Sequence, residues 1–141
     1  MIIQFTRLII INKKLPDNLS PDDIKAQTVG RVALFCANTR PEMILTGKTL
    51  SQTVGVDVIE SEYFDAMHIT GYSYPGFEII KKAEADTAIV IGNSFFLVSF
   101  LGSLEKIKGV NIANSVIMNK QIYSSTVTLI DWTEDVKIER L

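Results

Sequence analysis

The chain has 141 residues, of which 47% are hydrophobic and 21% are charged, and its formal net charge is −2. This is the usual size of one domain, so we expect a single domain over residues 1–141. A mildly acidic chain lacks the basic surface of nucleic-acid-binding proteins, and no nucleic-acid partner is expected. The single cysteine and single histidine exclude an internal disulfide, form no zinc site by themselves and suit a cytoplasmic protein.

The first third of the chain predicts a strand, a loop and a helix. Residues 2–12 are β-branched and nearly continuously apolar, as in a buried central strand. After a loop over 13–19, Ser20 is expected to cap a helix whose apolar stripe runs to about Ala37. Gly30 falls inside this helix, where it indicates a close contact with the sheet or with another helix.

The rest of the chain predicts shorter elements. In order, they are a helical turn over 41–45, a strand over 53–59, a buried strand over 87–91, an amphipathic helix over 94–108, two strands over 110–118 and 121–131 joined as a hairpin, and an edge strand over 136–140. Residues 77–85 fit either a short helix or a strand. The whole is an α/β fold, a mixed β-sheet of about 4–6 strands flanked by about 2–3 helices.

An uncharged run over 87–104 reaches the minimum length of a membrane-spanning helix. Gly92, Asn93 and Ser94 fall in its middle, with β-branched residues before them and Phe and Leu after them. This pattern indicates a strand, a turn and a helix, and we expect no membrane span.

The same turn is the first candidate ligand site. Backbone N–H groups at the start of a helix that follows a strand point outward and can bind phosphate or carboxylate. Gly92, Asn93 and Ser94 are therefore predicted to bind a small anionic ligand. The alternative is that Asn93 or Ser94 only caps the helix.

A second candidate surface lies in the aperiodic segment 60–76. It holds the only imidazole of the chain, His68, and it places Tyr72 and Tyr74 in a glycine-containing loop that could cover a pocket or form an interface. Four carboxylates lie near this histidine in the sequence, at Asp57, Glu60, Glu62 and Asp65. They could form an acid–base site, but their spacing matches no metal-ligand pattern, so no metal is expected.

Two further features are excluded from the site. The run Thr46-Gly47-Lys48-Thr49 imitates the end of a phosphate-binding loop, but the motif requires a glycine where the chain has Glu42. Nucleotide hydrolysis is therefore excluded, and the sequence specifies no cofactor. Cys36, on the buried face of the predicted helix, is expected to be inert.

Several short segments in the front of the chain match one known family, at residues 7–11, 15–19, 24–27, 32–33 and 41–42. They resemble the bacterial-archaeal type of peptidyl-tRNA hydrolase and the uncharacterised domains that share its fold. In that family a lysine a few residues before the helix's Ala-Gln pair serves catalysis, and a histidine follows on the same helix. The matching positions hold Asp23 and, near the histidine, Gly30 or Arg31. The resemblance therefore implies the fold without the activity.

Two functions of different classes follow. The first is a non-catalytic or accessory domain, a homo-oligomer that binds a small anionic ligand or a protein partner through the 92–94 turn and the tyrosine-containing loop. The alternative is a hydrolase-like enzyme on a peptidyl-tRNA-hydrolase-like fold, with Lys25, Asp65 or His68 as acid–base groups.

Overall fold

The computed structural model describes residues 6–37, 40–61, 84–93, 97, 125–131 and 137–141. Within these ranges the chain forms a six-stranded mixed sheet and two helices. The strands are β1 (Arg7–Asn12), β2 (Val32–Ala37), β3 (Val58–Ser61), β4 (Thr87–Gly92), β5 (Val127–Asp131) and β6 (Lys137–Arg140), and the helices are α1 (Pro21–Ala26) and α2 (Pro41–Val54). The expected mixed α/β fold is therefore confirmed.

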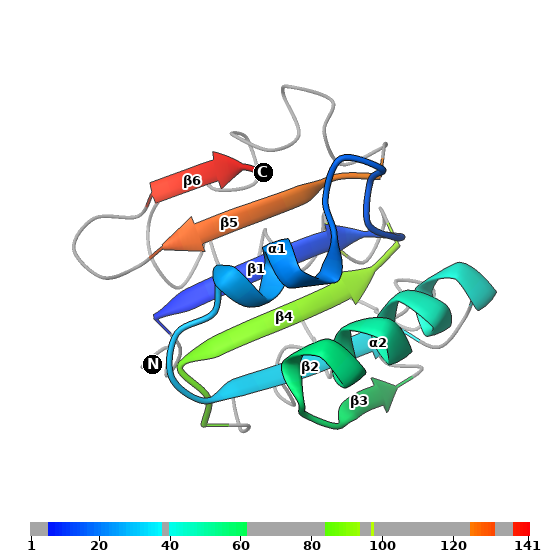
Figure 1. Ribbon diagram of the computed structural model, residues 1–141, viewed down its shortest axis with the longest axis horizontal. Helices are drawn as coiled ribbons and strands as arrows, with labels where there is room; N and C mark the ends of the chain where they lie inside the picture. The colour runs from blue at the N-terminus through cyan, green and yellow to red at the C-terminus, as the bar shows by residue number, and fades with distance from the viewer. Residues whose placement is uncertain (1–5, 38–39, 62–83, 94–96, 98–124, 132–136) are drawn as a thin grey trace, which may run out of the picture.

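The strands lie in the order β3-β2-β4-β1-β5-β6 (Figure 1). The four strands from β3 to β1 run parallel, while β5 is antiparallel to β1 and β6 is antiparallel to β5. Strands β1 and β4 are at the centre, and every residue of both is buried except the half-buried Arg7. This is why their sequences are continuous apolar runs rather than alternating ones.

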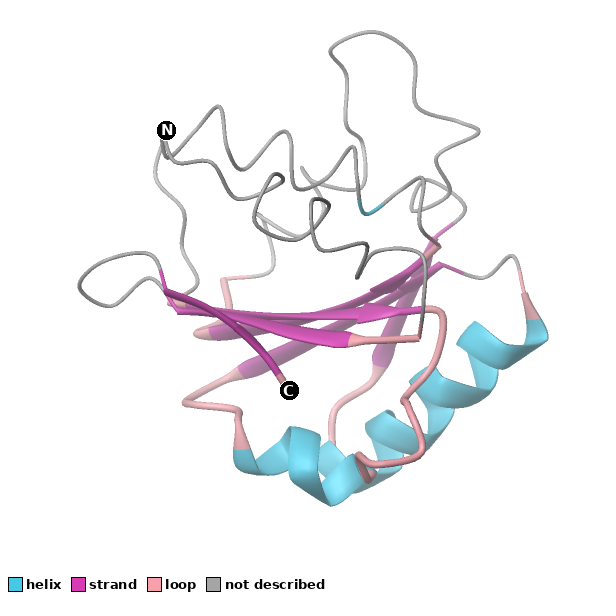
Figure 2. Ribbon diagram, turned by 90° about the horizontal axis from the view of Figure 1, so that it is seen from above, coloured by secondary structure: helices cyan, strands magenta, loops and turns pink. Residues whose placement is uncertain are grey.

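Both helices lie on the same face of the sheet (Figure 2). Helix α2 packs against β2, β3 and β4, and α1 packs beside it. The buried hydrophobic side chains of the helices are Ile24 in α1 and Met43 and Leu50 in α2, and they join the core formed by the strands.

The helix predicted from Ser20 to Ala37 is wrong beyond Ala26. The predicted cap is present, because the Ser20 hydroxyl accepts a hydrogen bond from the Asp23 N–H (3.2 Å) and the Asp23 carboxylate accepts one from the Ser20 N–H (2.8 Å). The helix then ends after six residues, and residues 32–37 form β2. A fully apolar strand also places apolar residues at helical spacing, so periodicity did not separate the two structures.

In residues 41–58 the error is the opposite one, because residues expected to form a strand belong to a helix. The helical turn expected at 41–45 is the start of α2, a helix of 14 residues, and the strand expected from Thr53 begins only at Val58. Gly55, with a left-handed φ of 83°, ends α2 between them. The alternating valines at 54, 56 and 58 thus cross a helix end, a turn and a strand start.

Cys36 lies in β2 and not on a helix face, although it is buried as expected. Its thiol donates a hydrogen bond to the carbonyl of Met43 in α2 (3.1 Å). Gly47 faces the same thiol, since a Cβ at this position would stand 3.2 Å from the sulfur. Gly47 therefore allows α2 to pack closely on β2, and the run around it is part of a helix, not of a phosphate-binding loop.

Other predictions are confirmed in part. The strand at 87–91 is β4, the last part of the 121–131 strand is β5, and the edge strand at 136–140 is β6. The predicted helix over 94–108 lies outside the described residues apart from Leu97, which is helical and buried. The strand over 110–118, its hairpin and residues 77–83 also lie outside them.

The uncharged run at 87–104 begins as β4 at the centre of the sheet. In the ranges that the structure describes, no helix is long and apolar enough to cross a membrane.

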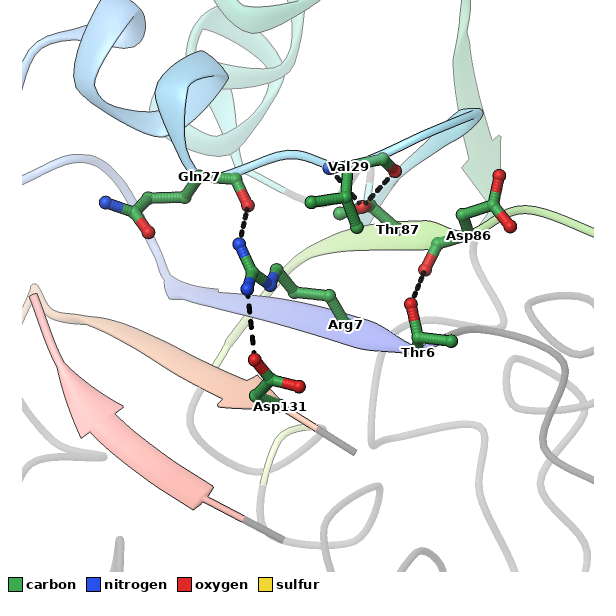
Figure 3. Close-up of polar contacts among 7 residues, drawn as sticks. All are labelled: Thr6, Arg7, Gln27, Val29, Asp86, Thr87 and Asp131. Carbon is green, nitrogen blue, oxygen red and sulfur yellow. Dashed lines mark hydrogen bonds and ion pairs between the residues drawn. The ribbon is translucent and has the colours of Figure 1, made fainter. Parts of the chain in front are cut away.

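A polar cluster ties the amino ends of β1 and β4 to the neighbouring elements (Figure 3). Arg7 donates through one guanidinium nitrogen to the carbonyl of Gln27 at the end of α1 (2.8 Å) and through the other to the carboxylate of Asp131 in β5 (3.0 Å). Thr87 both donates to the Val29 carbonyl (2.7 Å) and accepts from the Val29 N–H (2.8 Å). These bonds fix the chain between α1 and β2 over the amino edge of the sheet.

Replacing Arg7 by methionine should lower the free energy of unfolding by about 1–2 kcal/mol, because two charge-assisted hydrogen bonds are lost from a partly buried site while the aliphatic stem is kept. Urea denaturation measures this change. Arg140→Met, at an exposed arginine of β6, is the matched control and should change stability by less than about 0.5 kcal/mol. Equal losses in the two variants would contradict a bridging role for Arg7.

Candidate functional site

The centre of the sheet contains the point at which the chain connections change direction. After β1 the chain passes across β4 to reach β2, whereas after β4 it passes across β1 to reach β5. In open α/β sheets ligands bind outside the carboxyl ends of the parallel strands, at the point where the direction of the connections changes. The carboxyl ends of β1 and β4 therefore define the candidate site.

Backbone hydrogen bonds hold three chain segments together at this edge. The Asn12 N–H donates to the carbonyl of Thr126, just before β5 (2.9 Å), and the Lys13 N–H donates to the carbonyl of Gly92 at the end of β4 (3.0 Å). The register brings Asn12 opposite Gly92. The first residues after β1 are thus fixed in place relative to β4 and β5.

Lys13 has an uncommon backbone conformation. Its φ is 71°, in the left-handed region, and the Lys14 N–H donates to the carbonyl of Asn12 across it (2.9 Å). A hydrogen bond between residues two apart around a central positive φ defines the rare, strained form of the γ-turn. Such strain in a non-glycine residue persists only where its surroundings enforce it, and it is concentrated at functional sites.

Polar side chains surround this turn. Asn12 is 1% exposed, Asn93 is 8% exposed and Thr126 is 5% exposed, while the Lys13 side chain is half-buried and Lys14 is exposed. The edge of an otherwise apolar sheet is therefore polar and carries positive charge where β1 ends.

The predicted turn after β4 is at this site. The Leu97 N–H donates to the carbonyl of Asn93 (3.1 Å), and Leu97 itself is helical. Gly92 and Asn93 thus lie beside Lys13, as a ligand site at this turn requires. Ser94, His68, Tyr72 and Tyr74 are outside the described residues.

Lys25, a candidate acid–base group, is not at this edge. It is exposed in the last turn of α1, two residues before Gln27, whose carbonyl binds Arg7 at the amino end of β1. Asp57 is exposed in the turn before β3. In the part of the chain that the structure describes, no three His, Cys, Asp or Glu side chains gather as metal ligands would.

A separate groove of about 510 Å³ lies between α1 and β6, with Asp23, Gln27, Glu139 and Arg140 in its lining. Its charged side chains are exposed and of both signs, and the Asp23 carboxylate already accepts the capping hydrogen bond of α1. It therefore offers no concentrated charge for an anionic ligand.

The sequence reasoning missed Lys13 as a site residue. Lys13 and Lys14 belong to the loop expected over 13–19, and only their position directly after a buried strand points to the carboxyl edge. The γ-turn gave no sequence signal, because lysine is not a residue that favours positive φ. Thr126 was also missed, because it was expected inside a strand.

No protein-family model matches the chain, and no curated protein is significantly similar to it in sequence. Solved structures do match. The Agrobacterium tumefaciens protein provisionally named phosphohistidine phosphatase SixA superposes with a TM-score of 0.59 at 12% identity, covering 96% of this chain and 97% of that one. Mycobacterial glucosyl-3-phosphoglycerate phosphatase gives 0.52 at 8% identity and covers 96% of each chain. Phosphoglycerate mutase from Plasmodium falciparum gives 0.51 at 11% identity, covering 96% of this chain and 91% of that one.

The fold therefore matches that of these two phosphatases and of the mutase, and the expected peptidyl-tRNA-hydrolase-like fold is wrong. That resemblance placed 24–27 and 32–33 on one helix, whereas the chain turns between them and enters β2. The expectation of a non-catalytic accessory domain is also contradicted, because the matching structures are named as phosphatases and a mutase. The hydrolase alternative is the better supported one.

Proposed function

We propose that the protein is a phosphatase-like hydrolase whose phosphorylated substrate binds at the carboxyl ends of β1 and β4. The observation that carries the proposal is the half-buried Lys13, which directly follows β1 and whose N–H donates to the Gly92 carbonyl at the end of β4. The similarity of the fold to proteins named as phosphatases supports the same reaction class.

Hydrolysis of a phosphate monoester breaks the bond between phosphorus and the ester oxygen, and water supplies the new oxygen. Two contributions are needed from the protein. A cation stabilises the charge on the phosphoryl oxygens, and an acid protonates the leaving alcohol. Lys13 supplies the first. His68, the only imidazole of the chain, is proposed for the second, since imidazole is the side chain that most often transfers protons in catalysis.

We also propose the pocket residues, the oligomeric state and the location that the sequence leads us to expect. Ser94, Tyr72 and Tyr74 would complete the substrate pocket beside Gly92 and Asn93. A homo-oligomer in the cytoplasm is proposed from the high apolar content and from the single free cysteine.

The proposal predicts that the purified chain hydrolyses p-nitrophenyl phosphate and that inorganic phosphate inhibits the reaction competitively. His68→Gln should lower kcat by about 100-fold, because proton transfer to the leaving group is lost. Release of p-nitrophenolate measures both. The variant, purified in the same way, also controls for a contaminating phosphatase, which would leave the measured rate unchanged.

The location of the site has a separate test. Titration with inorganic phosphate should shift the backbone amide resonances of Asn12, Lys13, Gly92 and Asn93 in ¹⁵N-labelled protein, whereas that of the exposed Lys48 in α2 should stay in place. Absence of turnover on p-nitrophenyl phosphate, on a phosphoglycerate ester and on phosphohistidine would overturn the hydrolase proposal. Shifts confined to the groove between α1 and β6 would overturn the location.

A further inference from the structure

We propose that Lys13 is held in a strained γ-turn so that its ammonium group meets the phosphate group of the ligand, and that fold stability and phosphate affinity are therefore opposed at this one residue. The inference rests on the proposed function for the identity of the ligand. It goes beyond it by assigning phosphate recognition to one side chain and by linking that role to the backbone conformation.

The first step is the conformation itself. The φ of Lys13 is 71°. In this left-handed region the Cβ of lysine is in steric conflict with the backbone, whereas glycine has no Cβ and would adopt the same turn freely. Asparagine would tolerate it better than lysine does. A residue chosen only to close this turn would be one of those two. Lysine at this position therefore indicates a requirement for its side chain.

The second step is that the backbone of this turn has no donor left for a ligand. The N–H groups of Asn12, Lys13 and Lys14 donate to the carbonyls of Thr126, Gly92 and Asn12. In a phosphate-binding loop the backbone N–H groups themselves surround the anion. Here they are used within the protein, so recognition of an anion where β1 ends falls to a side chain.

The third step is the choice between the two lysines. The Lys13 side chain is half-buried, so its position is restricted by the edge of the sheet, whereas Lys14 is exposed. Among the described residues, no carboxylate forms an ion pair with Lys13. A lysine ammonium is a compact point charge that binds phosphate oxygens without a fixed orientation. Lys13 thus offers a restricted positive charge at the carboxyl ends of β1 and β4.

Four variants test the inference: Lys13→Gly, Lys13→Asn, Lys13→Arg and the control Lys14→Ala. The first two should raise the melting temperature by about 2–5 °C, since strain is relieved, and should weaken the binding of inorganic phosphate by about 10-fold, since the charge is lost. Lys13→Arg should keep the Kd for phosphate within about threefold and leave the melting temperature nearly unchanged. Lys14→Ala should move neither quantity by more than about twofold or 1 °C.

Calorimetric titration with inorganic phosphate and thermal unfolding followed by circular dichroism give the two readouts. A Kd that is equal in Lys13→Asn and in the unchanged protein would overturn the inference, and so would a lower melting temperature in both Lys13→Gly and Lys13→Asn. Neither readout uses turnover. If phosphate binds through Lys13 but no ester is hydrolysed, the inference stands and the hydrolase proposal fails. If esters are hydrolysed and turnover is unaffected by loss of the Lys13 charge, the hydrolase proposal stands and the inference fails.

Discussion

Replacing Phe35 by alanine is expected to lower the free energy of unfolding by about 3–5 kcal/mol, through the lost transfer of the ring and the cavity that it leaves. The ring is fully buried in β2. The next residue, Cys36, faces α2, so alternation along the strand directs Phe35 to the face of the sheet away from the two helices. The variant therefore measures how well that second face is packed.

Ile59 provides the matched control, because it is the register partner of Phe35 on the neighbouring edge strand β3 but is 39% exposed. Ile59→Ala should cost about 1 kcal/mol or less, since little apolar surface is removed from the core. Urea denaturation of both variants gives the comparison. A loss below about 1.5 kcal/mol for Phe35→Ala would mean that the face opposite the helices is loosely packed.

The second large effect is expected at Gly30, which was predicted inside a helix and is instead in the turn before β2. Its φ is 59°, and a Cβ built there would collide with the carboxylate of Asp86. That carboxylate accepts a hydrogen bond from the Arg31 N–H (2.8 Å), so it is held in place. Gly30→Ala should therefore cost about 2–4 kcal/mol, the sum of left-handed strain and overpacking.

A substitution at Gly55 distinguishes the effect of left-handed strain from that of overpacking. It also has a positive φ, 83°, but no atom lies within 4 Å of a Cβ built on it. Gly55→Ala should cost only the strain, about 1 kcal/mol. The built Cβ at Gly30 also stands 2.8 Å from the Asp86 Cβ, so the collision is removed only when Asp86 loses its whole side chain. In the double variant Gly30→Ala, Asp86→Gly, the loss relative to Asp86→Gly alone should fall to that of Gly55→Ala. Equal losses in the two single glycine variants would show that Asp86 moves aside without cost.

The amino and carboxyl edges of the sheet carry different kinds of polar contact. At the amino edge Arg7, Asp86 and Thr87 bind partners within the protein and fix the chain after α1. At the carboxyl edge the backbone is fixed in a similar way, but the charge of Lys13 has no carboxylate partner among the described residues. This difference between the two edges is expected, because ligands of parallel sheets bind at the carboxyl ends of the strands. The Arg7 variant tests the contacts of the amino edge, and the Lys13 variants test the carboxyl edge.

The sequence by itself determined the fold class and the two central strands. The runs Leu8–Ile11 and Ile89–Ile91 are apolar without interruption, because a strand covered on both faces has no solvated side. Ser20, Pro21 and Asp23 similarly marked the start of α1, because capping depends on neighbours in the chain. The turn predicted over 92–94 stays a prediction, because Gly92 is the last residue of β4 and Ser94 lies outside the described residues.

Only the tertiary structure decided the rest. The apolar residues after Gly30 fit a helix and a strand equally, and pairing of β2 with β4 and β3 selects the strand. The role proposed for Lys13 depends on Gly92 and Thr126, residues about 80 and 110 positions away in the chain, whose carbonyls fix the turn at the end of β1. Contacts between such distant residues leave no local pattern, so the strained lysine was visible only once the strands were assembled.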